Sequence, residues 1–361
     1  FSKINEKNKK RNIEFVKFSM LLNIAISVLL NTVLIIIILF SGYQASSGGD
    51  FTIGDLSKFI AYFNTLTWPM MAIGQLINIR SQGKASLERI NALLDYPVEI
   101  KDEDVVDVEI KGHITFNNLT FQYPGSNINA LENICLDIPQ GTSVGILGRT
   151  GSGKTTLVDM LLRLYNVEKE SIFIDGVDIM NVGLKNLRDN IGYVPQDNFL
   201  FSKTVLDNIC FSEESNDLEK AKLYAKYASV DTNIEDFPEK YDTVLGERGV
   251  TLSGGQRQRI SIARAMIKDP AILILDDSVS AVDTETEEKI LSYLKQTRKN
   301  KTTILVAHRI STVKDMDLIV LLDDGKVIAK GRHEELLETS KEYKDMVLLQ
   351  QLDEEEVGSH E

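Results

Sequence analysis

The sequence predicts an α/β domain that is preceded by membrane-spanning α-helices, and two observations support this fold class. Two long charge-free apolar segments occur before residue 80. From about residue 109 to residue 351, segments with strand patterns alternate with segments with helix patterns, which is typical of an α/β domain with a largely parallel sheet. The 361 residues are enough for two or three structural units.

The first apolar segment, residues 18–40, has 23 residues without a charge. As a helix it would be about 34 Å long, enough to cross a hydrocarbon core of ~30 Å. The second, at about 57–79, is free of charge over residues 59–79 but contains Pro69 and several polar residues. We therefore expect one side of the second helix to face protein or water rather than lipid. A buried helix of a soluble protein is the alternative, and the length of the first segment argues against it.

Charges beside these segments predict their orientation. Lysine and arginine are frequent before residue 18 and at residues 80–89, whereas residues 41–55 carry only Asp50 and Asp55. Under the positive-inside rule both ends lie in the cytoplasm. A helix is expected to continue over residues 81–94 and to stop before Pro97.

The composition of the whole chain narrows its functional class. The net charge of −13 argues against a nucleic-acid partner, which would require a basic face. The acidic runs at residues 102–107 and 353–356 predict a solvated linker, 95–108, and a tail, 352–361. Cys135 and Cys210 match no metal-binding spacing, and their scarcity fits a reducing compartment.

A glycine-rich loop between a predicted strand, residues 143–147, and a predicted helix, residues 155–164, has the Walker A pattern of P-loop NTPases. Backbone N–H groups and the start of the helix provide positive charge for phosphates. Lys154 is expected to reach the β- and γ-phosphates of ATP, and Thr155 to bind Mg²⁺. The predicted loop residues are Gly148, Arg149, Thr150, Gly151, Ser152, Gly153, Lys154, Thr155 and Thr156.

Two further motifs follow this loop. Residues 272–276 predict a buried strand that ends in Asp276, a second Mg²⁺ ligand of the Walker B type. About a hundred residues after the first loop comes a second phosphate-facing segment, in which Ser253 caps a predicted helix whose free amides would face an anion. Its residues are Leu252, Ser253, Gly254, Gly255 and Gln256.

With these motifs the chain resembles the second half of an ATP-binding cassette (ABC) exporter subunit over essentially its whole length. The resemblance implies that residues 1–94 are the last two helices of a membrane domain and that residues 109–351 form the nucleotide-binding ABC ATPase domain. It implies that Tyr123 stacks on adenine, that Gln196 senses Mg²⁺ and water, and that His308 is the switch histidine. The D-loop would be Ser280, Ala281, Val282 and Asp283, and the exporter-specific X-loop would be Glu247, Arg248 and Gly249.

The resemblance also implies a partner. In this family the Leu-Ser-Gly-Gly-Gln signature acts on ATP that is bound by a facing domain, so a second ABC half-transporter is expected. ATP binding and hydrolysis would then drive switching between inward- and outward-facing forms. The expected cargo is hydrophobic or amphipathic, such as a drug, lipid or peptide. The expected location is a bacterial cell membrane, with the nucleotide-binding domain in the cytoplasm.

One residue departs from the family pattern. Asp277 stands where the general-base glutamate is usual, and it is one methylene shorter. A carboxylate misplaced by about 1 Å can lose about 10²-fold in rate. The same substitution is found in heterodimeric ABC exporters with one degenerate ATP site, so the resemblance implies a degenerate site in a heterodimer, with the intact signature completing the partner's site. The alternatives are a regulatory subunit with negligible hydrolysis, a homodimeric exporter in which Asp277 suffices, and a soluble ABC ATPase, against which the two predicted spans argue.

Overall fold

A computed structural model describes residues 2–47, 51–246, 252–280 and 282–358. The chain divides into two compact units, residues 1–97 and residues 98–361. Each unit is described by itself.

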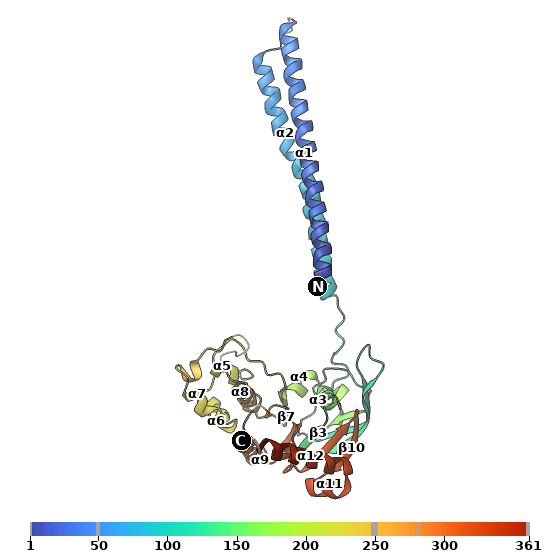
Figure 1. The fold of residues 1–361 in the computed structure, drawn as a ribbon, viewed down its shortest axis with the longest axis vertical. Helices are drawn as coiled ribbons and strands as arrows, with labels where there is room; N and C mark the ends of the chain where they lie inside the picture. The colour runs from blue at the N-terminus through green and yellow to red at the C-terminus, as the bar shows by residue number, and fades with distance from the viewer. Residues whose placement is uncertain (1, 48–50, 247–251, 281, 359–361) are drawn as a thin grey trace. The chain divides into compact units, whose positions relative to one another are not determined.

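The first unit is a hairpin of two long helices, α1 (Ser2–Ser46) and α2 (Ile53–Leu94), shown in Figure 1. Thr52 begins α2 with a capping box: its hydroxyl accepts a hydrogen bond from the Asp55 N–H, and the Asp55 carboxylate accepts one from the Thr52 N–H. Within α2 the hydroxyls of Thr65 and Thr67 donate to carbonyls four residues earlier. The helix ends three residues before Pro97, where the sequence predicted its end.

The apolar side chains of α1 have little protein to pack against; Leu29 and Ile36 are 63% and 59% exposed. Within the described part of the chain, only α1 combines the length and mean hydropathy of a membrane-crossing helix, over residues Ser2–Gln44. The second predicted span lies inside α2, and its role as a membrane span remains a prediction.

The second unit is built on a six-stranded sheet with the order β10-β9-β3-β8-β7-β6. All neighbouring strands are parallel except β9 and β10. The strands are β3 (Ser143–Gly148), β6 (Ile191–Val194), β7 (Ile272–Asp276), β8 (Thr302–Val306), β9 (Leu318–Asp323) and β10 (Lys326–Gly331). Along β7, Ile272 and Ile274 belong to one hydrophobic core, and Leu273 and Leu275 to the other. Both faces of this sheet are therefore covered, as expected for parallel strands.

A second, antiparallel sheet has the order β2-β1-β4-β5 and was not predicted. Its strands are β1 (Ile114–Gln122), β2 (Asn129–Ile138), β4 (Ile172–Ile174) and β5 (Val177–Asp178). The two short strands expected at residues 114–116 and 119–121 are one strand, interrupted by a register shift at Asn118, where φ is +49°. This irregularity breaks the alternation of apolar residues, which is why the sequence suggests two strands.

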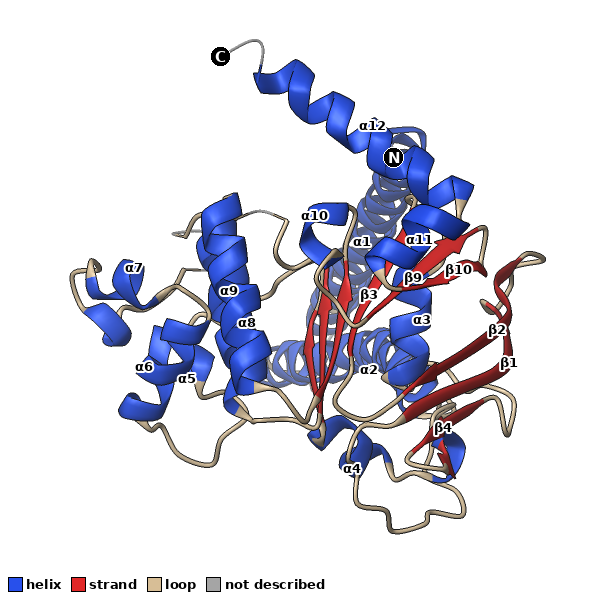
Figure 2. Ribbon diagram, turned by 90° about the horizontal axis from the view of Figure 1, so that it is seen from below, coloured by secondary structure: helices blue, strands red, loops and turns tan. Residues whose placement is uncertain are grey.

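Helices cover the six-stranded sheet on both sides (Figure 2). One side carries a group of helices from α5 to α9, and the other carries α3 and the antiparallel sheet. The helices are α3 (Lys154–Leu161), α4 (Leu184–Asp189), α5 (Val205–Ile209), α6 (Leu218–Tyr227), α7 (Asp231–Glu235), α8 (Gly254–Ile267), α9 (Thr284–Thr297), α10 (Ile310–Val313), α11 (His333–Thr339) and α12 (Lys341–Gly358), with 3₁₀ turns at Ile179–Asn181 and Lys240–Asp242.

One predicted boundary was wrong. The helix expected at residues 155–164 ends at Leu161, because Arg163 adopts a left-handed backbone with φ of +47°. The acidic tail expected at residues 352–361 stays a prediction; residues 352–358 continue α12.

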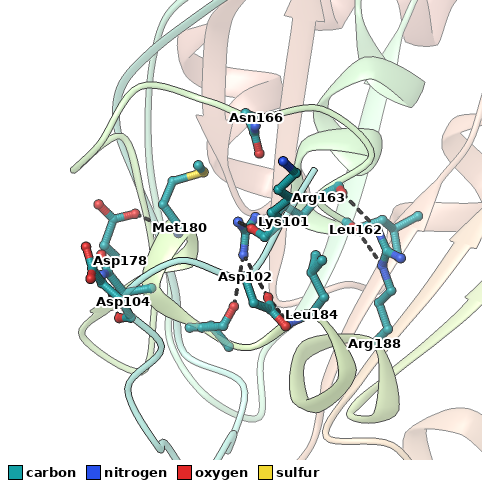
Figure 3. Close-up of polar contacts among 12 residues, drawn as sticks. Lys101, Asp102, Asp104, Leu162, Arg163, Asn166, Asp178, Met180, Leu184 and Arg188 are labelled. Atoms are coloured by element: carbon teal, nitrogen blue, oxygen red, sulfur yellow. Dashed lines mark hydrogen bonds and ion pairs between the residues drawn. The ribbon is translucent and has the colours of Figure 1, made fainter. Parts of the chain in front are cut away.

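The predicted acidic linker is partly bound to the second unit, and we call residues 101–106 the strap (Figure 3). Arg163, 1% exposed, donates from its guanidinium to the carbonyl oxygens of Lys101, at 2.6 Å, and Val182, at 3.0 Å. Asp102 lies 3.7 Å from the same guanidinium and accepts a hydrogen bond from the backbone N–H of Leu184. The expectation of a simply solvated linker is wrong for the strap, because its exposed acidic side chains are carried by a bound backbone.

Candidate functional site

The phosphate loop lies between β3 and α3, where the motif requires it. Two of its glycines leave no room for a side chain: a Cβ on Gly148 would overlap the Leu322 carbonyl oxygen, and one on Gly153 would lie 2.8 Å from that of Ala130. Gly153 also begins α3 with a left-handed φ of +98°. Glycine is the residue that adopts this conformation without a steric penalty.

Lys154 is 6% exposed, and its ammonium donates to the carbonyl oxygens of Gly148, at 2.8 Å, and Arg149, at 2.9 Å. Burial lowers the pKa of Lys154, while Asp276 and Asp277 oppose this shift. The ammonium is therefore held beside the loop and close to two carboxylates.

Asp276 ends β7 and is 1% exposed. Burial raises the pKa of Asp276, and a hydrogen bond with the Thr155 side chain opposes that shift. Among the described residues, its Oδ2 atom has no hydrogen-bond partner. A buried, unpartnered carboxylate oxygen beside a hydroxyl is a set of hard oxygen donors that suits Mg²⁺, so Thr155 and Asp276 fit this ion.

A cavity of about 430 Å³ brings most of the predicted site together. The predicted residues that line it come from several elements of the second unit. They are Tyr123, Thr150, Gly151, Gly153, Lys154, Thr155, Thr156, Gln196, Asp276, Asp277 and His308. Gly148, Arg149 and Ser152 belong to the loop but do not line the cavity.

Tyr123 lines the cavity from the position directly after β1. Its hydroxyl donates to Oγ1 of Thr156 at 3.0 Å. Its ring meets those of Phe121 and Tyr165 edge to face, with centroids 5.1 and 5.3 Å apart. Burial raises the pKa of Tyr123, so the neutral phenol is maintained. These contacts fix the orientation of the ring beside the phosphate loop.

Asp277 lies next to the Mg²⁺ candidate ligands with a left-handed backbone, φ +48°. Its N–H donates to the Val306 carbonyl, and its Oδ2 accepts a hydrogen bond from Nε2 of Gln196 at 3.3 Å. Aspartate is among the few residues other than glycine that adopt this conformation readily. The carboxylate is thus already engaged by the glutamine that shares its cavity.

The signature segment does not join this cavity. Ser253 begins α8 with a capping box: its hydroxyl accepts from the Gln256 N–H, and the Gln256 side chain accepts from the Ser253 N–H. Ser253 and Gly254 are exposed, and a Cβ on Gly254 would meet no atom within 4 Å. Among the described residues, none covers Gly254, so the start of α8 is open at this position.

Ser280, Val282 and Asp283 of the predicted D-loop also lie outside the cavity lining. The Ser280 hydroxyl donates to the Asp277 carbonyl at 2.9 Å, and Asp283 begins α9 by accepting a hydrogen bond from the Thr286 N–H. Hydrogen bonding to Thr286 lowers the pKa of Asp283, and Val282 is buried. Ala281 and the X-loop residues Glu247, Arg248 and Gly249 lie outside the described residues.

The cavity has further lining residues that the sequence did not predict, namely Ser126, Ile128, Asn129, Ala130, Asp324 and Gly325. The pair Asp324-Gly325 is a turn signal between two strands. Only the fold shows that this turn reaches the phosphate loop, where the Gly325 N–H donates to the Ser152 carbonyl at 3.1 Å.

Comparison with known proteins gives a consistent result. Residues 131–280 match the family model described as ABC transporter. The chain is 43% identical over 305 residues to the "Probable multidrug resistance ABC transporter ATP-binding/permease protein YheI" of Bacillus subtilis, covering 84% of this chain and 52% of that protein. It is 34% identical over 355 residues to the ATP-dependent lipid A-core flippase of Haemophilus influenzae, covering 97% and 60%.

Among solved structures, a bacterial Atm1-family ABC exporter with ATP bound is similar with a TM-score of 0.80 and 35% identity. The match covers 91% of this chain and 58% of that one. The chain spans about half the length of the curated relatives it matches.

Proposed function

Because residues 131–280 form an ABC transporter ATPase domain and the relatives of the chain are ABC exporter ATP-binding/permease proteins, we propose that this chain is a subunit of an ATP-driven exporter. One observation carries the proposal. A single cavity gathers the phosphate loop, two oxygen donors for Mg²⁺, Gln196, Asp277 and His308, while the signature lies on an open surface elsewhere.

The residues that line this cavity have distinct roles in ATP binding and hydrolysis. The Lys154 ammonium exchanges its loop carbonyls for the phosphates, and the loop amides orient them. Thr155 and Asp276, with Gln196 nearby, would hold Mg²⁺, which neutralises phosphate charge. Tyr123 packs against adenine. Asp277 orients and deprotonates the attacking water, and His308 faces the same cavity and would contact the terminal phosphate.

The open start of α8 supports a site shared between two chains. The capped N-terminus of α8 presents partial positive charge that can bind an anion. An anion bound in this chain's own cavity would not reach it, because residues 252–256 do not line that cavity. We propose that residues 252–256 complete the ATP site of a second ABC half-transporter. ATP then joins the two nucleotide-binding domains, and its hydrolysis releases them.

Asp277 makes the two sites of such a dimer unequal. Its carboxylate is shorter than that of glutamate and is hydrogen-bonded to Gln196. We propose that this chain's own site turns ATP over slowly and that the partner, a different chain, has the stronger base.

The membrane helices belong to a bacterial cell membrane, with the ATPase domain in the cytoplasm, and the cargo is a hydrophobic or amphipathic drug, lipid or peptide.

Substitutions at the two sites test this assignment through the ATPase rate of the assembled transporter. Asp277→Glu should raise the rate modestly, because the carboxylate gains reach. Ser253→Arg should abolish it, because a bulky cation would replace the cap at the partner's phosphate. If Asp277→Asn stops turnover as completely as Ser253→Arg, the degenerate-site proposal is wrong.

A regulatory subunit with negligible hydrolysis is a second candidate, and the existing bond between Asp277 and Gln196 favours it. The ATPase rate of the chain with and without its partner separates the two functions. A rise on pairing supports the exporter subunit, and an unchanged rate supports the regulator.

A homodimeric exporter is tested separately, by cross-linking. A cysteine placed at Ser280 should form a cross-link between two copies of this chain if the transporter is a homodimer.

A further inference from the structure

The C-terminal helix α12 contacts the loop that carries His308 through one side chain. Gln350 donates from Nε2 to the His308 carbonyl oxygen at 2.7 Å and accepts at Oε1 from the Ile310 N–H at 2.8 Å. Its single amide therefore bonds to the backbone on both sides of Arg309.

Both polar groups of the Gln350 amide have a backbone partner in this contact. Ile310 is the first residue of α10, and the first N–H groups of a helix have no partner inside the helix. Arg309, at the N-cap, makes no side-chain cap bond, so Gln350 supplies the capping acceptor from another helix. A side-chain amide has one acceptor and one donor group, and both are used here.

Side chains earlier in α12 hold this helix against the domain and so fix the position of Gln350. Tyr343, fully buried near the start of α12, shares a hydrogen bond of 2.8 Å with Nδ1 of His333. Met346 and Val347 pack against the core that contains Leu275 and Leu305. The helix thus rests on the body of the domain, and Gln350 extends from it to the loop.

We propose that Gln350 is a positioning residue for ATP hydrolysis, which holds the backbone of residues 308–310 so that the His308 side chain faces the cavity. This inference rests on the proposed function, because His308 has a reaction to assist only if the cavity hydrolyses ATP. His308 is itself exposed, so its own side chain has little packing to fix it.

The direct test measures hydrogen exchange at the Ile310 amide in the full chain, by mass spectrometry of a peptide that spans residues 307–313. Gln350→Met removes both hydrogen bonds but keeps length and helix propensity. Gln351→Met is the matched control on the exposed next position. Loss of a bond of ~1 kcal/mol should speed exchange about two- to tenfold for Gln350→Met. Equal exchange in both variants would overturn the proposal.

The kinetic test uses the assembled transporter with Asp277→Glu in this chain and with the partner's general-base carboxylate replaced by its amide, so that the measured turnover comes from this chain's site. Adding Gln350→Met should lower kcat by roughly tenfold or more, as expected for a misplaced catalytic group. KM for ATP should stay within about twofold, because the phosphate loop and Tyr123 are untouched. An unchanged kcat would refute the positioning role. A complete lack of hydrolysis by the unsubstituted transporter would instead refute the proposed function.

Discussion

At the scale of single residues, Tyr123 shows how a side chain is prepared for a ligand. Its ring is held edge to face by Phe121 and Tyr165, and its hydroxyl by Thr156, one residue after a Mg²⁺ candidate ligand. An aromatic ring fixed in this way loses little conformational entropy when a base stacks on it.

Replacement of Tyr123 should therefore weaken nucleotide binding. Tyr123→Ala removes the stacking surface, and we expect the Kd for ATP, measured by calorimetry, to rise about five- to hundredfold, since base stacking on aromatic rings contributes ~1–3 kcal/mol. Tyr123→Phe keeps the ring and should change Kd by less than about fivefold. A large effect of Tyr123→Phe would show that the hydroxyl, and not the ring, is the important group.

At the scale of elements, the strap contacts two segments of the ATPase domain, the end of α3 and the start of α4, that are connected to the candidate ATP site. Arg163 follows α3, which begins at Lys154, and Asp102 bonds to the start of α4, which leads into β6 and on to Gln196. The Arg188 side chain completes this contact by donating to the carbonyls of Leu162 and Arg163 (Figure 3). The strap therefore links the chain after α2 to two elements of the site.

Removal of the buried guanidinium should release the strap. Arg163→Met leaves the carbonyls of Lys101 and Val182 without this donor, and we expect a loss of about 2–4 kcal/mol in the free energy of unfolding. Faster hydrogen exchange over residues 101–106 should accompany it. Both are measurable on the full chain in detergent.

Asp102→Asn is the matched control for this prediction. The asparagine keeps an oxygen that accepts from the Leu184 N–H, and the ion pair it removes has a partly exposed carboxylate. Its cost should stay below about 1 kcal/mol. If Asp102→Asn costs as much as Arg163→Met, the ion pair holds the strap and the backbone bonds do not.

At the scale of the whole molecule, the hairpin of α1 and α2 and the ATPase domain require different surroundings. The apolar surface of α1 needs lipid or further helices, whereas the ATPase domain has two cores of its own. The charge distribution around these two helices predicts that the connection between them lies outside the cell.

Labelling with a membrane-impermeant maleimide tests that topology in intact bacteria. Ser46→Cys, in the last turn of α1, should be labelled, while the exposed native Cys135 of the ATPase domain should react only after the membrane is permeabilised. Cys210 is buried and should remain silent in the folded chain. Labelling of Cys135 in intact cells would contradict the proposed orientation.

The sequence by itself determined the local chemistry of this protein. Gly148–Thr155, Asp276 and the cap at Ser253 are recognisable because each motif is contiguous and acts through its own backbone geometry. The same holds for the end of α2 before Pro97 and for β3 and β7, two buried strands of the six-stranded sheet that the sequence predicted.

Only the tertiary structure decided which of these segments meet. It excludes residues 252–256 from the cavity, brings the Asp324-Gly325 turn to the phosphate loop, and joins Gln350 to the loop of His308. It also shows the strap bound by Arg163. Each of these contacts links residues that are far apart in the chain, and no local pattern encodes such a pairing because its energy arises only when the whole domain is packed.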